Sequence, residues 1–405
     1  MWSNRNVWIV LCGEFVAGLG LWTSIIANLE FMQHHVPSDF MKSLILFTGL
    51  LAGVLIGPYA GKVIDSHRKK NVLIWAGIGR MASVCFMFLA IAQSSVWWMI
   101  LFAICLQISA AFYFPALQSV IPLIVQDKDL IALNGIHMNA STIARIIGTV
   151  AAGMMLSVMS LSALYTASLV AYGLLLVSTY FLDIDEGGEQ KRNLNRKEKQ
   201  GGGFKEIVPM LKGMPVALTA LGLSIIPGFF IGSFNLMVIN ISEMHQDSQI
   251  KGWLYAAEGI AFILAAFFVK RISGQRDLLK QLFTLSFIIA GAQALLFFAH
   301  VKWMTIVAFA LFGLAAGFFF PLLSTYFQKS IPKELHGRFF SFRTMLDRVL
   351  FQVVLLAAGF SLDTIGLPYM VLIFSGLSLF ILFYGVFHSF DSAAKHKQDT
   401  ETSAS

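Results

Sequence analysis

The sequence predicts an all-α membrane protein with twelve transmembrane helices in two six-helix halves. Three observations support this prediction: 57% of the 405 residues are hydrophobic, only 13% are charged, and the apolar residues occur in long blocks. In a soluble domain about a quarter of the residues are charged. Most of the surface of this protein is therefore expected to face lipid.

The lengths of the apolar blocks identify the individual spans. A helix needs about 20 predominantly apolar residues to cross the hydrocarbon core of a bilayer. Blocks of this size are predicted at 6–28, 41–63, 71–93, 96–118, 134–157, 161–182, 213–240, 251–270, 281–299, 303–326, 341–362 and 366–388.

The distribution of Lys and Arg predicts the orientation, because cytoplasmic loops of membrane proteins are enriched in these residues. With the N-terminus in the cytoplasm, 22 Lys and Arg residues fall in inner segments, and only Lys42, Lys251 and Lys302 fall in outer segments. We therefore expect a multi-pass protein of the cell membrane with both termini in the cytoplasm. The net charge of +7 would then face anionic membrane lipids, so the charge does not call for a nucleic-acid partner.

A long polar stretch divides the chain between the sixth and seventh spans. Because this stretch is charged, glycine-flanked and poor in apolar residues, we interpret it as a flexible linker. The predicted parts are an N-terminal half at 1–183, a cytoplasmic linker at 184–212, a C-terminal half at 213–390 and a cytoplasmic tail at 391–405.

The two halves are weakly similar in sequence. The segment AAFYFPAL at 110–117 resembles AGFFFPLL at 316–323, an offset of 206 residues, and the same offset aligns the basic loops after spans two and eight. Two six-helix halves in parallel repeat are typical of one class of secondary transporter.

The end of span two carries the most specific motif. Gly61, Asp65, Lys69 and Lys70 match the loop 2–3 signature of the major facilitator superfamily, although Ser66 stands where a basic residue is usual. The resemblance implies a conformational latch, in which Asp65 accepts hydrogen bonds from the positive N-terminus of span eleven. The predicted latch comprises Gly61, Asp65, Arg68, Lys69 and Lys70. The alternative is a charged boundary that only sets topology.

A nearer branch of this superfamily also shows in the sequence. The segments FPAL at 114–117, IP at 121–122, ARIIG at 144–148 and GRFFS at 337–341 are similar to the macrolide-efflux and siderophore-exporter branch. This resemblance implies a transporter that works by alternating access of its two halves.

Several glycines are expected at helix-packing positions. Span two contains four glycines at a spacing of four residues, which form one small-residue stripe: Gly49, Gly53, Gly57 and Gly61. In the architecture of the superfamily the partner of this stripe is span eleven, where it would slide; static packing is the alternative. Gly148 and Gly153 in span five match only part of the antiporter glycine motif.

Ionisable groups within spans are costly and are treated as functional candidates. A carboxyl group away from water can carry a proton, because its charged form is disfavoured there. Glu14 and Glu258 are the candidates for proton coupling; for Glu14 the alternative is a structural ion pair with Arg80 or Arg145. Polar residues that share helix faces are candidates for lining a central cavity: Asn28, Gln107, Gln118, Asn134, Ser141, Arg145 and Asn235.

The expected function is secondary active transport, as proton-coupled efflux of amphipathic small molecules or drugs. The alternative is a transporter of a specific metabolite, lipid or siderophore. Since neither a catalytic pattern nor a phosphate-binding loop occurs in the sequence, we expect no enzymatic activity, cofactor or metal. The expected partners are a small-molecule substrate, protons and membrane lipids, and the protein is expected to be a monomer.

Overall fold

The computed structural model describes residues 2, 4–184, 214–273, 278–332 and 336–402, which form helices joined by short turns and loops. The chain forms two compact units. Unit 1 comprises Met1–Gln200 with Gln246–Ala256, and unit 2 comprises Gly201–His245 with Ala257–Ser405. The chain crosses between the units within the predicted linker, most of which lies outside the described residues, and crosses again near residue 246.

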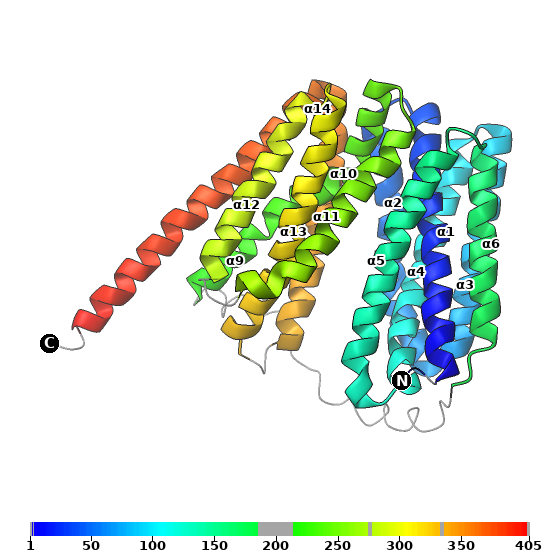
Figure 1. The fold of residues 1–405 in the computed structure, drawn as a ribbon, viewed down its shortest axis with the longest axis horizontal. Coiled ribbons are helices and arrows are strands. Elements are labelled where there is room, and N and C mark those ends of the chain that lie inside the picture. Colours follow the sequence, from blue (N-terminus) through cyan, green and yellow to red (C-terminus); the bar gives the residue numbers. More distant parts are fainter. Residues whose placement is uncertain (1, 3, 185–213, 274–277, 333–335, 403–405) are drawn as a thin grey trace. The chain divides into compact units, whose positions relative to one another are not determined.

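Unit 1 is a bundle of six long helices (Figure 1). The central helix α1 packs against α5 and α6, while α4 packs against α2 and α3, and α3 also packs against α6. Their bounds are α1 Arg5–His35, α2 Asp39–Ser66, α3 Lys69–Gln93, α4 Val96–Ile124, α5 Asp127–Met155 and α6 Leu161–Tyr180.

Side-chain caps fix where several of these helices begin. Asn4 precedes α1 and accepts a hydrogen bond from the amide of Asn6, and Ser38 precedes α2 and accepts one from the amide of Met41. Ser160 does the same for α6. Such caps satisfy amide groups that have no partner within the helix.

Unit 2 is built from the later helices, with α10 packed on α14 and α12 packed on both α13 and α14. The bounds are α9 Pro215–Leu223, α10 Ile225–His245, α11 Gln249–Ser273, α12 Leu278–Leu295, the 3₁₀ turn η3 Leu296–Phe298, α13 Lys302–Ser330 and α14 His336–Thr402. The helix α11 starts in unit 1 and ends in unit 2.

The predicted spans coincide closely with these helices. The seventh is divided at Ser224 into α9 and α10, and the last two lie within α14, which is interrupted at Gly366 with φ 75°. The helix α14 continues to Thr402, beyond the predicted start of the tail. Nine helical segments of the described chain are long and apolar enough to cross a membrane, so the count of twelve stays a prediction.

The 206-residue repeat also appears in the helix bounds. Helix α4 begins at Val96 and ends at Ile124, and α13 begins at Lys302 and ends at Ser330, so both ends differ by 206 residues. Each of the two helices contains a proline at the equivalent position, Pro115 and Pro321.

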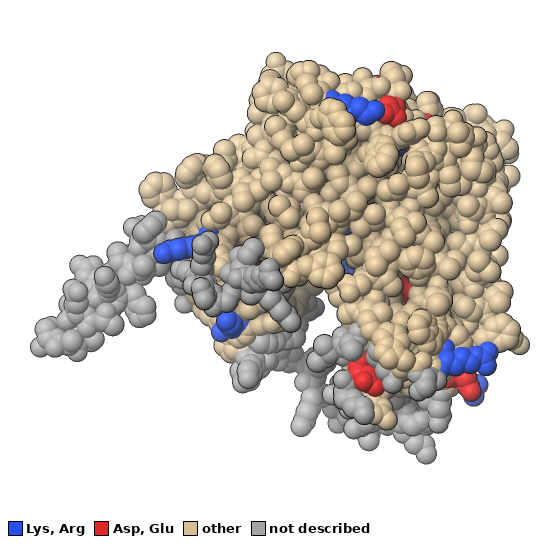
Figure 2. Space-filling view, viewed as in Figure 1, with Lys and Arg blue, Asp and Glu red and all other residues tan. Residues whose placement is uncertain are grey.

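The surface of the helices is strongly apolar. Large hydrophobic side chains such as Trp97, Phe267, Trp303 and Phe380 are more than two-thirds exposed. On the face shown in Figure 2, Lys, Arg, Asp and Glu lie mainly near the helix ends and leave a broad uncharged area. Two of the three lysines predicted outside form ion pairs instead of facing water: Lys42 with Asp39 at 2.9 Å and Lys251 with Glu30 at 2.7 Å.

Candidate functional site

The candidate site in unit 1 is a buried polar cluster around Glu14, to which four helices contribute. Glu14 lies on α1, Arg80 on α3, Tyr113 on α4 and His137 on α5. The side chains of Glu14, Arg80 and Tyr113 are buried, and His137 is mostly covered. Because buried ionisable groups are tolerated only with suitable partners, the contacts of Glu14 define what the site can do.

Glu14 accepts one hydrogen bond and lies close to one imidazole. The hydroxyl of Tyr113 donates a hydrogen bond to Glu14 Oε1, and His137 Nε2 lies 3.6 Å from Glu14 Oε2. The distance to His137 is too long for a good hydrogen bond, so the imidazole acts on the carboxylate through its charge when it is protonated.

Arg80 completes the cluster through aromatic contacts. Its guanidinium carbon lies 4.0 Å from the centre of the Tyr113 ring and 5.1 Å from that of the Phe114 ring. Such cation–π contacts stabilise a cation that has left water. The predicted structural ion pair of Glu14 with Arg80 is therefore not what the structure shows: Tyr113 lies between them, and its hydroxyl is the group that contacts the carboxylate.

This arrangement can accommodate the gain or loss of one proton at Glu14. A tyrosine hydroxyl donates to a carboxylate, and it can accept from a protonated carboxyl group after rotation of its hydrogen. The imidazole of His137 can be neutral or cationic. Both partners thus adapt to either state without a change in helix packing.

The second predicted carboxylate, Glu258, lies in unit 2 on α11 and is also buried. Its backbone is in very close contact with Gly313 of α13, where an added Cβ would overlap the Glu258 carbonyl oxygen. Glu14 and Glu258 belong to different units, and a role of Glu258 in proton coupling stays a prediction.

The predicted cavity residues lie in varied surroundings. Arg145 lies with its guanidinium carbon 5.7 Å from the Trp22 ring, while Asn28 carries a buried Oδ1 without a hydrogen-bond partner. Gln118 is exposed, and Gln107, Ser141 and Asn235 are half-buried. The side chain of Asn134 lies outside the described part of the chain. Their role in a cavity stays a prediction.

The predicted packing glycines fall into two groups. An added Cβ at Gly49 or Gly53 would contact Ala103 or Gln107 of α4, and one at Gly148 would come within 3.0 Å of Leu19 and Trp22 of α1. Within unit 1, α4 is the neighbour of Gly49 and Gly53, and sliding of the glycine stripe against span eleven stays a prediction. Gly57 and Gly61 have no described atom within 4 Å of an added Cβ.

The predicted latch residues lie at the end of α2 and the start of α3. Asp65 is exposed, Arg68 precedes the first turn of α3, and Lys70 Nζ lies 5.7 Å from the centre of the Tyr180 ring. The loop before α14, 333–335, lies outside the described residues, and the latch stays a prediction.

Comparison with known proteins decides the family. The sequence model of the Major Facilitator Superfamily matches residues 10–351 and 229–404. The chain belongs to this superfamily. Within the Major Facilitator Superfamily it is 23% identical to macrolide efflux protein A of Streptococcus pyogenes over 371 residues, which cover 86% of this chain and 87% of that protein.

Another superfamily relative is the lysophospholipid transporter LplT of Yersinia enterocolitica, which is 22% identical over 332 residues, 80% of this chain and 79% of that protein. Among solved structures, that of a mutant of the nucleoside transporter NupG matches with a TM-score of 0.77 at 12% identity and covers 95% of this chain and 100% of that one. At this identity the match establishes the fold. The superfamily and the apolar helices make the protein a multi-pass membrane transporter.

Proposed function

We propose that this transporter exports amphipathic small molecules in exchange for protons, with Glu14 as the proton carrier. The observation that supports the proposal is the buried carboxylate of Glu14, held by a tyrosine hydroxyl and near an imidazole. Ionisable groups inside membrane proteins commonly mark proton relays. Efflux as the direction is supported by the similarity to macrolide efflux protein A.

In this scheme Glu14 alternates between two states. When ionised it accepts the hydrogen bond from Tyr113 and is electrostatically stabilised by the nearby Arg80. When protonated it is neutral, and Arg80 retains its cation–π contacts with Tyr113 and Phe114. A cationic substrate is favoured by the ionised state and disfavoured by the protonated one, so substrate and proton would bind in alternation.

The proposed orientation places the protein in the cell membrane with both termini in the cytoplasm. It is supported by the 22 Lys and Arg residues in the predicted inner segments against three in the outer ones. In this orientation protons enter the cell down their gradient while substrate leaves.

The test is uptake of a fluorescent lipophilic cation into everted membrane vesicles, with and without an acidic lumen. Wild-type protein is expected to accumulate the dye only with the gradient, and Glu14→Gln is expected to lose this accumulation. Gln keeps an oxygen for Tyr113 but cannot carry a proton. Glu258→Gln, in the other unit, shows whether a second carboxylate is required. Gradient-driven uptake by Glu14→Gln equal to that of wild type would contradict the proposal.

A second candidate function is transport of a lipid, favoured by the similarity to LplT over 80% of the chain. Uptake of a fluorescent lysophospholipid in the same vesicles distinguishes the two. If wild-type protein moves the lipid and none of a panel of lipophilic cations, the substrate is a lipid, and the export of drugs is wrong.

A further inference from the structure

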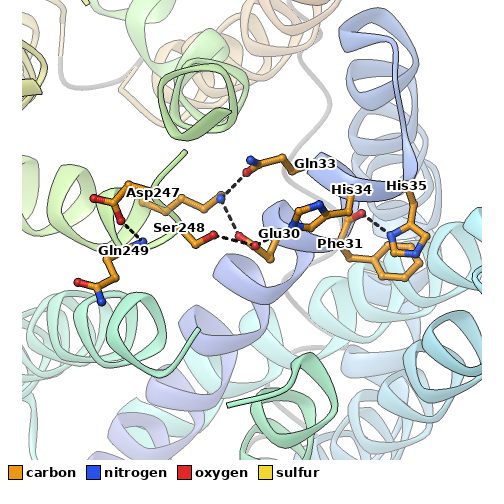
Figure 3. A network of polar contacts seen from close by, with 9 residues as sticks. Glu30, Phe31, Gln33, His34, His35, Asp247, Ser248 and Gln249 are labelled. Carbon is orange, nitrogen blue, oxygen red and sulfur yellow. Dashed lines mark hydrogen bonds and ion pairs between the residues drawn. The ribbon is translucent and has the colours of Figure 1, made fainter. Parts of the chain in front are cut away.

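A second polar cluster in unit 1 is built around the buried residues Glu30 of α1 and Lys251 of α11. We call it the Glu30 cluster; it comprises Glu30, Gln33, His34, Ser248 and Lys251 (Figure 3). Lys251 Nζ lies 2.7 Å from Glu30 Oε2 and also donates to Gln33 Oε1. Ser248 Oγ donates to Glu30 Oε1 at 2.8 Å, and His34 Nε2 lies 3.0 Å from the same oxygen.

The burial of Lys251 makes this cluster different from an ordinary surface ion pair. Its side chain is 0% exposed, and that of Glu30 is 9% exposed. A lysine is almost never fully buried without a partner, and removing one member of a buried pair leaves an uncompensated charge. Glu30 and Lys251 can therefore stay buried only as a pair, and separation of Gln246–Ala256 from α1 requires both charges to become hydrated.

Two further contacts attach the same segment to unit 1. An added Cβ on Gly252 would lie 2.7 Å from the Thr149 carbonyl oxygen and 3.2 Å from Gly153 Cα, so the two backbones touch. The Tyr255 ring packs edge-on against Trp22 of α1 with 5.9 Å between ring centres. The segment is thus held by α1 and α5 together.

Beyond Ala256 the same helix is attached to unit 2. An added Cβ on Gly317 of α13 would lie 2.6 Å from the Phe262 carbonyl oxygen, and one on Gly313 would overlap the Glu258 backbone. Helix α11 contains no proline, the usual cause of a sharp kink. If the two units change their arrangement, a straight α11 cannot stay attached to both.

We propose that the Glu30 cluster is a releasable latch that detaches from Gln246–Ala256 once in each transport cycle. Close glycine contacts occur on both sides of the segment, at Gly252 in unit 1 and at Gly313 and Gly317 in unit 2. The attachment to unit 1 also contains an ion pair, whose two charges can exchange each other for water when the segment lifts. This proposal rests on alternating access in the proposed function, but it does not depend on Glu14 or on protons.

The test measures how accessible the covered surface is in purified protein in lipid nanodiscs. Tyr255→Cys places a thiol at a position that is 4% exposed, in a protein whose three native cysteines are replaced by alanine. The rate of reaction with a water-soluble maleimide reports the detached state. We expect slow labelling in this background and about tenfold faster labelling when Lys251→Met is added, since a buried pair is lost.

Three further variants keep the test decisive. Lys302→Met removes an exposed lysine near the start of α13 and is expected to leave the rate unchanged. Glu30→Gln with Lys251→Met buries no unpaired charge, so it is expected to fold and still label fast. The exchange Glu30→Lys with Lys251→Glu is expected to restore slow labelling.

Two results would overturn the proposal that the Glu30 cluster is a releasable latch. In the first, the neutral double variant is labelled as slowly as the Tyr255→Cys background. In the second, Lys302→Met and Lys251→Met are labelled equally fast. These comparisons need no substrate. A failure of the proposed transport function would instead appear as absent dye accumulation in vesicles, with the differences in labelling retained.

Discussion

At the scale of single residues, the Tyr113 hydroxyl is the group that most directly controls Glu14. We expect Tyr113→Phe to reduce proton-driven transport about tenfold, because a hydrogen bond to a charged group contributes about 1.5–3 kcal/mol. The measurement is the initial rate of dye accumulation in everted vesicles with an acidic lumen.

Tyr165→Phe is the matched control. Tyr165 is fully buried like Tyr113, but its hydroxyl has no hydrogen-bond partner in the structure. We expect it to transport at the wild-type rate. Equal rates for the two variants would show that the Tyr113 hydroxyl does not contribute to coupling.

Glu14 could be predicted from the sequence, but two of its neighbours were missed. A carboxylate in a long apolar block is conspicuous by charge alone, whereas Tyr113 lies in an aromatic run that also fits lipid contact. His137 had a usable signal, since it falls three residues after Asn134 and four before Ser141 on one helix face. Which of these faces meet depends on tertiary packing.

At the scale of helices, close glycine contacts determine how α1 and α5 pack. We expect Gly148→Val to destabilise the protein by about 1–3 kcal/mol, because its side chain would overlap Leu19 and Trp22. The measurement is the apparent melting temperature in detergent. Gly57→Val on α2, where an added Cβ meets no described atom within 4 Å, is expected to change it much less. A lower melting temperature for Gly57→Val than for Gly148→Val would contradict this account.

The break in α14 depends on one glycine. Gly366 has φ 75° and ψ 170°, a conformation essentially restricted to glycine. We expect Gly366→Ala to lower the free energy of unfolding by about 1–3 kcal/mol. Gly376→Ala, also in α14 and with no described atom within 4 Å of an added Cβ, is the control and is expected to retain the wild-type melting temperature. The same melting temperature for both variants would argue against strain at residue 366.

Most helix positions could be predicted because about 20 apolar residues are a strong and local signal. The limits of prediction appear where the answer depends on a neighbour. The glycine repeat of α2 indicates close packing but not its partner, which is α4 at Gly49 and Gly53. The division between α9 and α10 at Ser224 had a usable signal in Pro227, whose missing amide cannot bond to the Leu223 carbonyl.

At the scale of the whole molecule, the division into units follows contacts that the sequence does not reveal. The polar linker indicates one boundary, but the grouping of Gln246–Ala256 with unit 1 depends on Glu30 and Lys251, which are 221 residues apart. In the sequence Lys251 is one of three outer cations, without any sign of its burial. The proposed proton site thus lies in one unit, and the proposed releasable contact involves a helix that belongs to both.

The most direct test of the central claim, proton exchange through Glu14, is to follow proton movement during transport. Purified protein in liposomes with a trapped pH indicator is given a substrate gradient and no imposed pH gradient. We expect substrate entry to drive protons out of the lumen in wild type, and Glu14→Gln to exchange labelled substrate without moving protons. Proton movement by Glu14→Gln at the wild-type ratio to substrate would contradict the account.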